Sequence, residues 1–193
     1  MRARILGIGQ VRACGDGVLA LRAALRGDRP APEWIEMTPA SRGIRVPGFT
    51  ASAAGLAAMT EARFVRRLDP FAQRFLLAAL LAVKDGGGLG APERAGIVVA
   101  TGYGPLATSF AFLDDLIDQG DDLGSPFKFS ISVHNAPASS LSLLPGVTGP
   151  TLTVTSFDGA WPMALASAMR WLEERTVDRA IVLAGDEYHG VLG

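Results

Sequence analysis

Short apolar strand patterns alternate with helical patterns along this chain, and that alternation constrains its fold more than any other feature. The segment Arg94–Thr101 contains Gly-Ile-Val-Val-Ala, a continuous apolar run that is typical of strands covered on both faces. Thr151–Ser156 alternates threonine with apolar residues, and Arg179–Ala184 is a further strand pattern. Strands separated by helices predict a layered α/β domain with a mostly parallel sheet.

Two helices have recognisable start signals. Asp69 followed by Pro70 predicts a helix capped by the Asp69 side chain, with glycines 86–88 ending it. Asp158 and Gly159 stand before an apolar helical pattern that runs to Glu174. We therefore expect Asp158 to cap that second helix.

The N-terminal part predicts one more strand and one more helix. Arg4–Val11 reads as a short buried strand, and a helix is expected from Val18 to about Gly27. With the strands above, this predicts a mixed, mostly parallel sheet of about five strands. We expect residues 1–193 to form a single domain.

Composition excludes several classes of function. The 193 residues are 49% hydrophobic and carry a formal net charge of −1, which gives no electrostatic basis for binding nucleic acid. No apolar stretch reaches the roughly 18 residues that a membrane span needs, and the N-terminus lacks the pattern of a signal peptide. A single cysteine, Cys14, fits a cytoplasmic location.

Common cofactor and metal motifs are missing. Gly7-Ile8-Gly9 begins a dinucleotide fingerprint, but Arg12 stands where its third glycine belongs. The chain has two histidines, and the run Asp186–His189 is the only local cluster of metal donors. We interpret that run as a solvated strand end, and we expect no metal and no cofactor.

Six segments along nearly the whole chain form an ordered set: Ile5–Val11, Leu68–Ala72, Ala95–Gly102, Ser130–Pro137, Gly149–Ala160 and Arg179–Asp186. Together, and in this order, they resemble the N-terminal half of β-ketoacyl synthases. The resemblance implies a thiolase-like fold, and the segment Ser130–Pro137 is especially similar to a short branch of chain-length-factor-like proteins.

Asp158 stands where the resemblance places the nucleophilic cysteine of the synthases, with Ser156, Phe157 and Gly159 as its neighbours in the elbow. Condensation needs a thiolate to accept the acyl group, and a carboxylate is a poor nucleophile toward a thioester. We therefore expect no catalytic residue here. An acyl-transferring or thioester-hydrolysing enzyme that uses Asp158 is the alternative.

The resemblance also implies a second catalytic half, and we expect the chain to lack it, because the sequence ends just after its last strand pattern. His134 lies in the wrong segment to supply the missing histidines, so we interpret it as a structural hydrogen-bonding residue. The Asn135 side chain is likewise expected to fix neighbouring backbone by hydrogen bonds. Both residues are also candidates for a tunnel or interface.

In thiolase-like dimers, the strand that matches this chain's threonine-rich strand pairs across the two-fold axis. Here its residues are Thr151, Leu152, Thr153, Val154 and Thr155, without charge or proline. The resemblance thus implies a partner, either an active ketosynthase or a second copy, and an acyl carrier protein in addition.

The leading hypothesis is a non-catalytic, chain-length-factor-like subunit of a ketosynthase in fatty-acid, polyketide or aryl-polyene-type biosynthesis. A homodimeric scaffold without an acyl ligand is a further alternative. Aromatic residues are candidates for the tunnel or interface, with ordinary core packing as the competing interpretation of each: Phe110, Phe112, Phe157 and Trp161.

Overall fold

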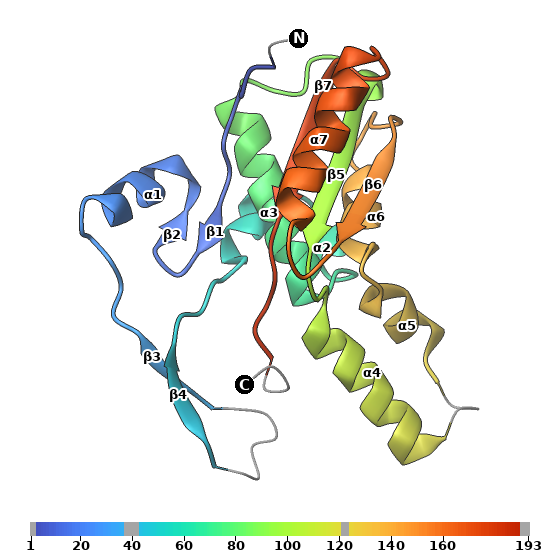
Figure 1. The fold of residues 1–193 in the computed structure, drawn as a ribbon. Coiled ribbons are helices and arrows are strands. Elements are labelled where there is room, and N and C mark those ends of the chain that lie inside the picture. Colours follow the sequence, from blue (N-terminus) through green and yellow to red (C-terminus); the bar gives the residue numbers. More distant parts are fainter. Residues whose placement is uncertain (1–2, 37–42, 121–123, 190–193) are drawn as a thin grey trace.

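Three parallel strands form the central sheet of the chain. The computed structural model describes residues 3–36, 43–120 and 124–189 (Figure 1). The central strands are β5 (Ala95–Thr101), β6 (Thr151–Thr155) and β7 (Arg179–Ala184), in the order β6-β5-β7. Since all three run parallel, their carboxyl ends meet at one edge of the sheet. Every residue of β5 is buried, as its apolar sequence predicts.

Helices cover both faces of this sheet. Helix α7 (Ala160–Glu173) packs one face with small residues, Ala160, Ala164 and Ala168, against Val98 and Ala100 of β5. Helices α3 (Pro70–Asp85) and α6 (Ala136–Ser142) cover the other face. The main core there joins apolar residues of both helices to the sheet, among them Phe71, Leu76, Leu77, Ile97, Val99 and Leu141.

The start of α3 confirms the capping prediction. Asp69 accepts hydrogen bonds from the backbone N–H groups of Phe71 (3.2 Å) and Ala72 (3.1 Å), and Pro70 occupies the first turn. Gly86 ends the helix. Six apolar side chains of α3 are buried, so the helix is held by both its cap and its packing.

The N-terminal strand prediction is wrong. Only Val11–Arg12 (β1) forms a strand, and it pairs with Gly15–Asp16 (β2) rather than with the central sheet. The preceding residues run along α3, where a Cβ on Gly9 would come within 1.9 Å of the Ala78 carbonyl oxygen. Ile5 is 84% exposed, so this segment is not buried either.

The N-terminal helix and a two-stranded ribbon stand apart from the central layers. Helix α1 (Gly17–Leu25) buries no residue, and β3 (Glu33–Glu36) pairs with β4 (Arg45–Gly48) in a separate antiparallel ribbon. Figure 1 places α4 and α5 beyond the carboxyl ends of the central strands. The other elements are η2 (Ala54–Ala58), α2 (Ala62–Val65), η3 (Pro92–Arg94), α4 (Leu106–Gln119) and α5 (Pro126–Ser132).

The layered α/β architecture with a parallel sheet is confirmed, but the sheet is smaller than the predicted five strands and is not mixed. Antiparallel pairing among the described residues occurs only in the two separate ribbons. The N-terminal segment packs against α3, whereas the prediction placed it as a strand of the central sheet. No helix in the described ranges is long and apolar enough to cross a membrane.

Candidate functional site at the elbow

The candidate site lies where the three parallel strands end, at the elbow between β6 and α7. The elbow comprises residues 156–159, and Gly159 adopts the left-handed conformation with φ of 87°. A glycine takes this conformation at little cost, whereas other residues are strained in it. The local sequence therefore allows the chain to reverse sharply and start α7 immediately after β6.

Asp158 does not cap α7, so the capping prediction for this residue is wrong. The cap position is Gly159, and no side chain there accepts a hydrogen bond. Asp158 is exposed, and only its backbone carbonyl is engaged, by the hydroxyl of Ser156. The left-handed turn at Gly159 displaces Asp158 from the position that a capping side chain needs.

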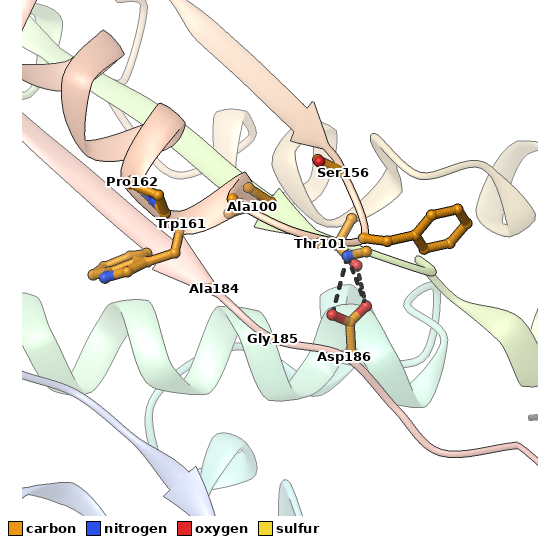
Figure 2. A pocket seen from close by; sticks show the side chains of 12 residues that line it. Ala100, Thr101, Ser156, Trp161, Pro162, Ala184, Gly185 and Asp186 are labelled. Carbon is orange, nitrogen blue, oxygen red and sulfur yellow. Dashed lines mark hydrogen bonds between the residues drawn. The ribbon is translucent and has the colours of Figure 1, made fainter.

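The elbow borders a small pocket of about 220 Å³. Its walls come from the ends of β5 and β7 and from the first turn of α7 (Figure 2). Ser156, Phe157, Gly159 and Trp161 line it, whereas Asp158 does not. The Asp158 carboxylate, at the position where the resemblance predicts a thiol, thus lies outside the pocket wall.

Asp186, two residues beyond β7, fixes the turn that follows β5. Its carboxylate accepts hydrogen bonds from the Thr101 hydroxyl (2.6 Å) and from the backbone N–H groups of Gly102 (3.0 Å) and Tyr103 (2.9 Å). Figure 2 shows these contacts on the wall of the pocket. Thr101 in turn accepts from the Gly104 N–H (2.9 Å), so the turn is held by a closed network.

Glu187 joins two helices beside this turn. It accepts from the N–H of Ala107 (2.9 Å) in α4 and pairs with Arg74 (2.8 Å) in α3. Burial raises the pKa of Glu187, and the nearby Asp69 adds to that rise, while Ala107, Arg74 and His189 oppose it. The interpretation of Asp186–His189 as a solvated strand end is therefore wrong for Glu187. The carboxylates of Asp186 and Glu187 both connect elements that are distant in the sequence.

Two aromatic pairs involve predicted residues. The Phe157 ring, 78% exposed, packs against Tyr103 with 5.2 Å between ring centroids, at the edge of the elbow pocket. Phe110 stacks on His189 at 4.9 Å. Phe112 contacts Phe129 of α5 at 5.7 Å. Neither Phe110 nor Phe112 lines the elbow pocket, so the structure separates these α4 aromatics from the elbow.

His134 and Asn135 lie at the start of α6 and are both exposed. The His134 ring packs against Gly104, where a Cβ would come within 2.9 Å of its Cδ2 atom. Within the described part of the chain, neither side chain makes a hydrogen bond, and only the Asn135 backbone carbonyl accepts one, from Ser139. The predicted hydrogen-bonding roles of these two side chains are therefore wrong.

A larger groove of about 650 Å³ runs along the outer edge of β7. It lies between residues 182–188 and the N-terminal residues 9–12, with α3 forming its base. Of the predicted site residues, only Trp161 reaches it. Gln10 also lines it, and its buried Oε1 atom has no hydrogen-bond partner among the described residues.

No activated nucleophile is seen at the elbow among the described residues. Ser156 donates its hydroxyl to a backbone carbonyl, so no base within the described residues takes that proton. Cys14 lies in the turn between β1 and β2 and lines neither pocket. Nor do three His, Cys, Asp or Glu side chains gather as a metal site in the parts of the chain that the structure describes.

Sequence reasoning missed the Asp186 network. Thr101, Gly102 and Asp186 are 84 to 85 residues apart, and no local pattern links them. The available signal was their shared position at the carboxyl ends of neighbouring parallel strands: Thr101 ends β5, Gly102 follows it, and Asp186 follows β7. That rule places residues at one edge but does not select which of them bond.

The parallel sheet, its covering helices and the elbow after β6 define a layered α/β protein. Residues 46–189 match the family described as Beta-ketoacyl synthase, N-terminal domain, which is more than half of the chain. The chain belongs to this family. No curated protein matches the chain significantly in sequence.

Solved structures share the fold at low sequence identity. The ishigamide ketosynthase/chain length factor aligns with a TM-score of 0.74 at 20% identity, over 97% of this chain and 53% of that structure. A type II polyketide acyl carrier protein complex with its ketosynthase bound to the hexaketide gives 0.67 at 22%, over 100% and 54%. A ketosynthase in complex with its chain length factor from Xenorhabdus doucetiae gives 0.57 at 16%, over 87% and 63%. This chain therefore spans little more than half the length of the first two.

Proposed function

We propose that this chain is a non-catalytic, chain-length-factor-like subunit that pairs with an active β-ketoacyl synthase in fatty-acid, polyketide or aryl-polyene-type biosynthesis. The observation that carries the proposal is the elbow without a thiol. The resemblance places the family's nucleophile at Asp158, whose exposed side chain makes no hydrogen bond within the described residues and lines neither the elbow pocket nor the larger groove. Without a thiolate, the elbow retains the shape of a ketosynthase site but not its condensation chemistry.

An exposed apolar face on α7 supports the pairing. Trp161, Met163 and Met169 are 45%, 55% and 44% exposed, although each is a large apolar side chain. Burial of such side chains against a partner stabilises a complex by about 25 cal/mol for each Å² removed from water. The sheet also ends in β6, whose outer edge pairs with no other strand among the described residues.

Two further assignments belong to the same proposal. Phe110, Phe112, Trp161, His134 and Asn135 are proposed as tunnel or interface residues, with the growing chain and an acyl carrier protein reaching the partner's active site. The cytoplasm is the proposed location, because an oxidising compartment would favour paired cysteines and the sequence has only Cys14.

Co-purification with a ketosynthase encoded beside this chain tests the pairing. A tagged ketosynthase should retain the parent chain, and Met163→Glu should weaken the complex because it buries a charge in the apolar face. Thr176→Glu, at an exposed position after α7, is the matched control. Failure of the parent chain to co-elute, with the product length unchanged when it is left out, would contradict the proposal.

Turnover of an acyl carrier thioester tests the competing enzyme. If Asp158 acted as a nucleophile, the parent chain would consume the thioester and Asp158→Ala would not. We expect no turnover by either protein, since no base or donor is bonded to the Asp158 carboxylate within the described residues.

A further inference from the structure

Helices α4 and α5 take no part in the apolar cores of the domain. No described residue from 106 to 132 belongs to either core cluster or packs against one, and neither helix has a buried residue. The two helices pack against each other instead, through the rings of Phe112 and Phe129. An ion pair between Asp115 and Lys128 joins them as well. They therefore form one unit, here called the arm, which projects beyond the carboxyl ends of the central strands (Figure 1).

The two ends of the arm meet at one place. The arm leaves the body of the domain after Gly104 and returns to it at His134, and the His134 ring packs against Gly104. Beside this point the Ser109 hydroxyl donates to the Ser132 carbonyl (2.8 Å). The body is fixed on either side, since the Asp186 network holds the preceding turn and α6 packs into the main core. A unit whose ends lie together can rotate about that point without disturbing the sheet.

Two polar contacts hold the first turn of α4 to the body. Glu187, in the segment after β7, accepts from the N–H of Ala107 (2.9 Å), and Arg74 pairs with the same carboxylate (2.8 Å). The Thr108 hydroxyl donates to Asp69 (3.2 Å), the cap of α3. A few hydrogen bonds stabilise an attachment less than a shared apolar core does, so a unit held in this way opens more easily than the rest of the domain.

A ring contact completes the attachment. Phe110 stacks on His189 with 4.9 Å between the ring centroids and 7° between the ring planes. All three contacts to the body fall within residues 107–110, whereas Leu113 and Ile117, farther along α4, are 47% and 80% exposed. The attachment is thus confined to the end of the arm that lies next to its pivot.

We propose that the arm is a hinged element of this fold, which is latched by Glu187 and turns about the contact of Gly104 with His134. In the closed state the three contacts fix the first turn of α4. In the open state these contacts are broken, while α4 and α5 keep their packing against each other. Only the selection of one state by a partner rests on the proposed function, which places Phe110 and Phe112 at a tunnel or interface.

Distances between spin labels on the full chain test the hinge. In a Cys14→Ser background, one label is attached at Ile117→Cys on α4 and the other at Ala58→Cys, exposed in η2. Glu187→Ala should shift the distribution of distances between the labels and raise the ratio of open to closed arms at least about ten-fold, the loss expected for one hydrogen bond to a charged group. An identical distribution in the parent and in Glu187→Ala would overturn the proposal.

Two further label pairs separate rotation of the arm from unfolding. Ile117→Cys with Ser130→Cys lies within the arm, and its distances should be the same in the parent and in Glu187→Ala because the two helices move together. Ala58→Cys with Thr176→Cys lies within the body and should also be unaffected, since η2 packs in the main core. A change in either pair would overturn the hinge, because the motion would then not be that of a rigid arm.

Thr108→Val is a second way to weaken the latch. It removes the contact with Asp69, so it should shift the distances between arm and body in the same direction as Glu187→Ala. Asp178→Ala is the matched control, because it removes an exposed carboxylate that pairs with Arg94 at the other end of β7, and it should shift nothing. Opposite shifts in the two latch variants, or an equal shift in Asp178→Ala, would overturn the latch.

A ketosynthase added to the labelled chain tests the role of the partner separately. Binding that narrows the distances between arm and body to one state supports that role. Binding that leaves the distances unchanged contradicts it, whereas the response of the free chain to Glu187→Ala still decides the hinge. Failure of the ketosynthase to bind at all counts against the proposed function and not against the hinge.

Discussion

The carboxylate of Asp186 accepts a 2.6 Å hydrogen bond from the hydroxyl of Thr101, and this contact joins the end of β7 to the end of β5. The same carboxylate holds the N–H groups of Gly102 and Tyr103, and Tyr103 packs on Phe157 of the elbow. Asp186, two residues beyond β7, thus fixes the turn that follows β5. This turn lies beside the elbow that follows β6.

Asp186→Ala should loosen this turn. The variant removes the hydrogen-bond acceptor of the Thr101 hydroxyl and of the Gly102 and Tyr103 N–H groups. We expect the unfolding free energy to fall by about 1–3 kcal/mol. Urea denaturation measures the loss, and faster amide exchange at Tyr103 locates it. Asp178→Ala removes an exposed carboxylate paired with Arg94 and should leave Tyr103 exchange unchanged. Equal exchange in both variants would contradict the role of Asp186.

Asp69→Ala should destabilise the chain by about 0.5–2 kcal/mol, because its side chain caps α3. Asp16→Ala is a matched control, since Asp16 holds the same position before α1 but makes no capping hydrogen bond. Thermal or urea unfolding compares the two. An equal loss in both variants would show that capping is not the cause.

The stability of the chain should depend on pH through Glu187. Burial raises its pKa in the folded protein above the ordinary value of 4.5, so the folded state holds this proton more tightly than the unfolded state. The contribution of Glu187 to the unfolding free energy is present in full below pH 4.5. It is lost as the pH rises through the pKa of Glu187 in the folded protein.

Urea denaturation across this range should therefore show a smaller fall in unfolding free energy for Glu187→Gln than for the parent. The amide can still accept from Ala107, so the fold is retained. Glu36→Gln, at an exposed position of β3, should follow the parent profile. Parallel profiles for parent and Glu187→Gln would rule out this carboxyl as the source.

Gly159→Ala should cost about 1–2 kcal/mol, because φ of 87° strains any residue with a Cβ. The adjacent Asp158→Ala should change stability little, since the Asp158 side chain caps nothing. The urea midpoints of the two variants decide between Gly159 and Asp158 as the residue on which the elbow depends. A larger loss at Asp158 would restore the cap that the sequence predicts.

Local signals in the sequence determined the parts of the fold that depend on neighbours along the chain. Asp69 and Pro70 define the start of α3 because a cap and its N–H groups lie within three residues. The apolar run Ala95–Thr101 defines a strand that is buried throughout. The missing thiol at the elbow is likewise a property of the sequence alone, and it does not depend on how the chain packs.

Tertiary structure decided what depends on contacts between distant residues. The N-terminal run has a strand-like sequence, but Gly7 and Gly9 allow its backbone to approach α3 instead of the sheet. Asp158 carries a capping side chain, but the left-handed turn at Gly159 takes the cap position from it. Asp186 meets Thr101 only because β5 and β7 are neighbours that run parallel. Sequence patterns give the conformation that each segment favours, whereas packing and hydrogen bonding between segments select which of these is realised.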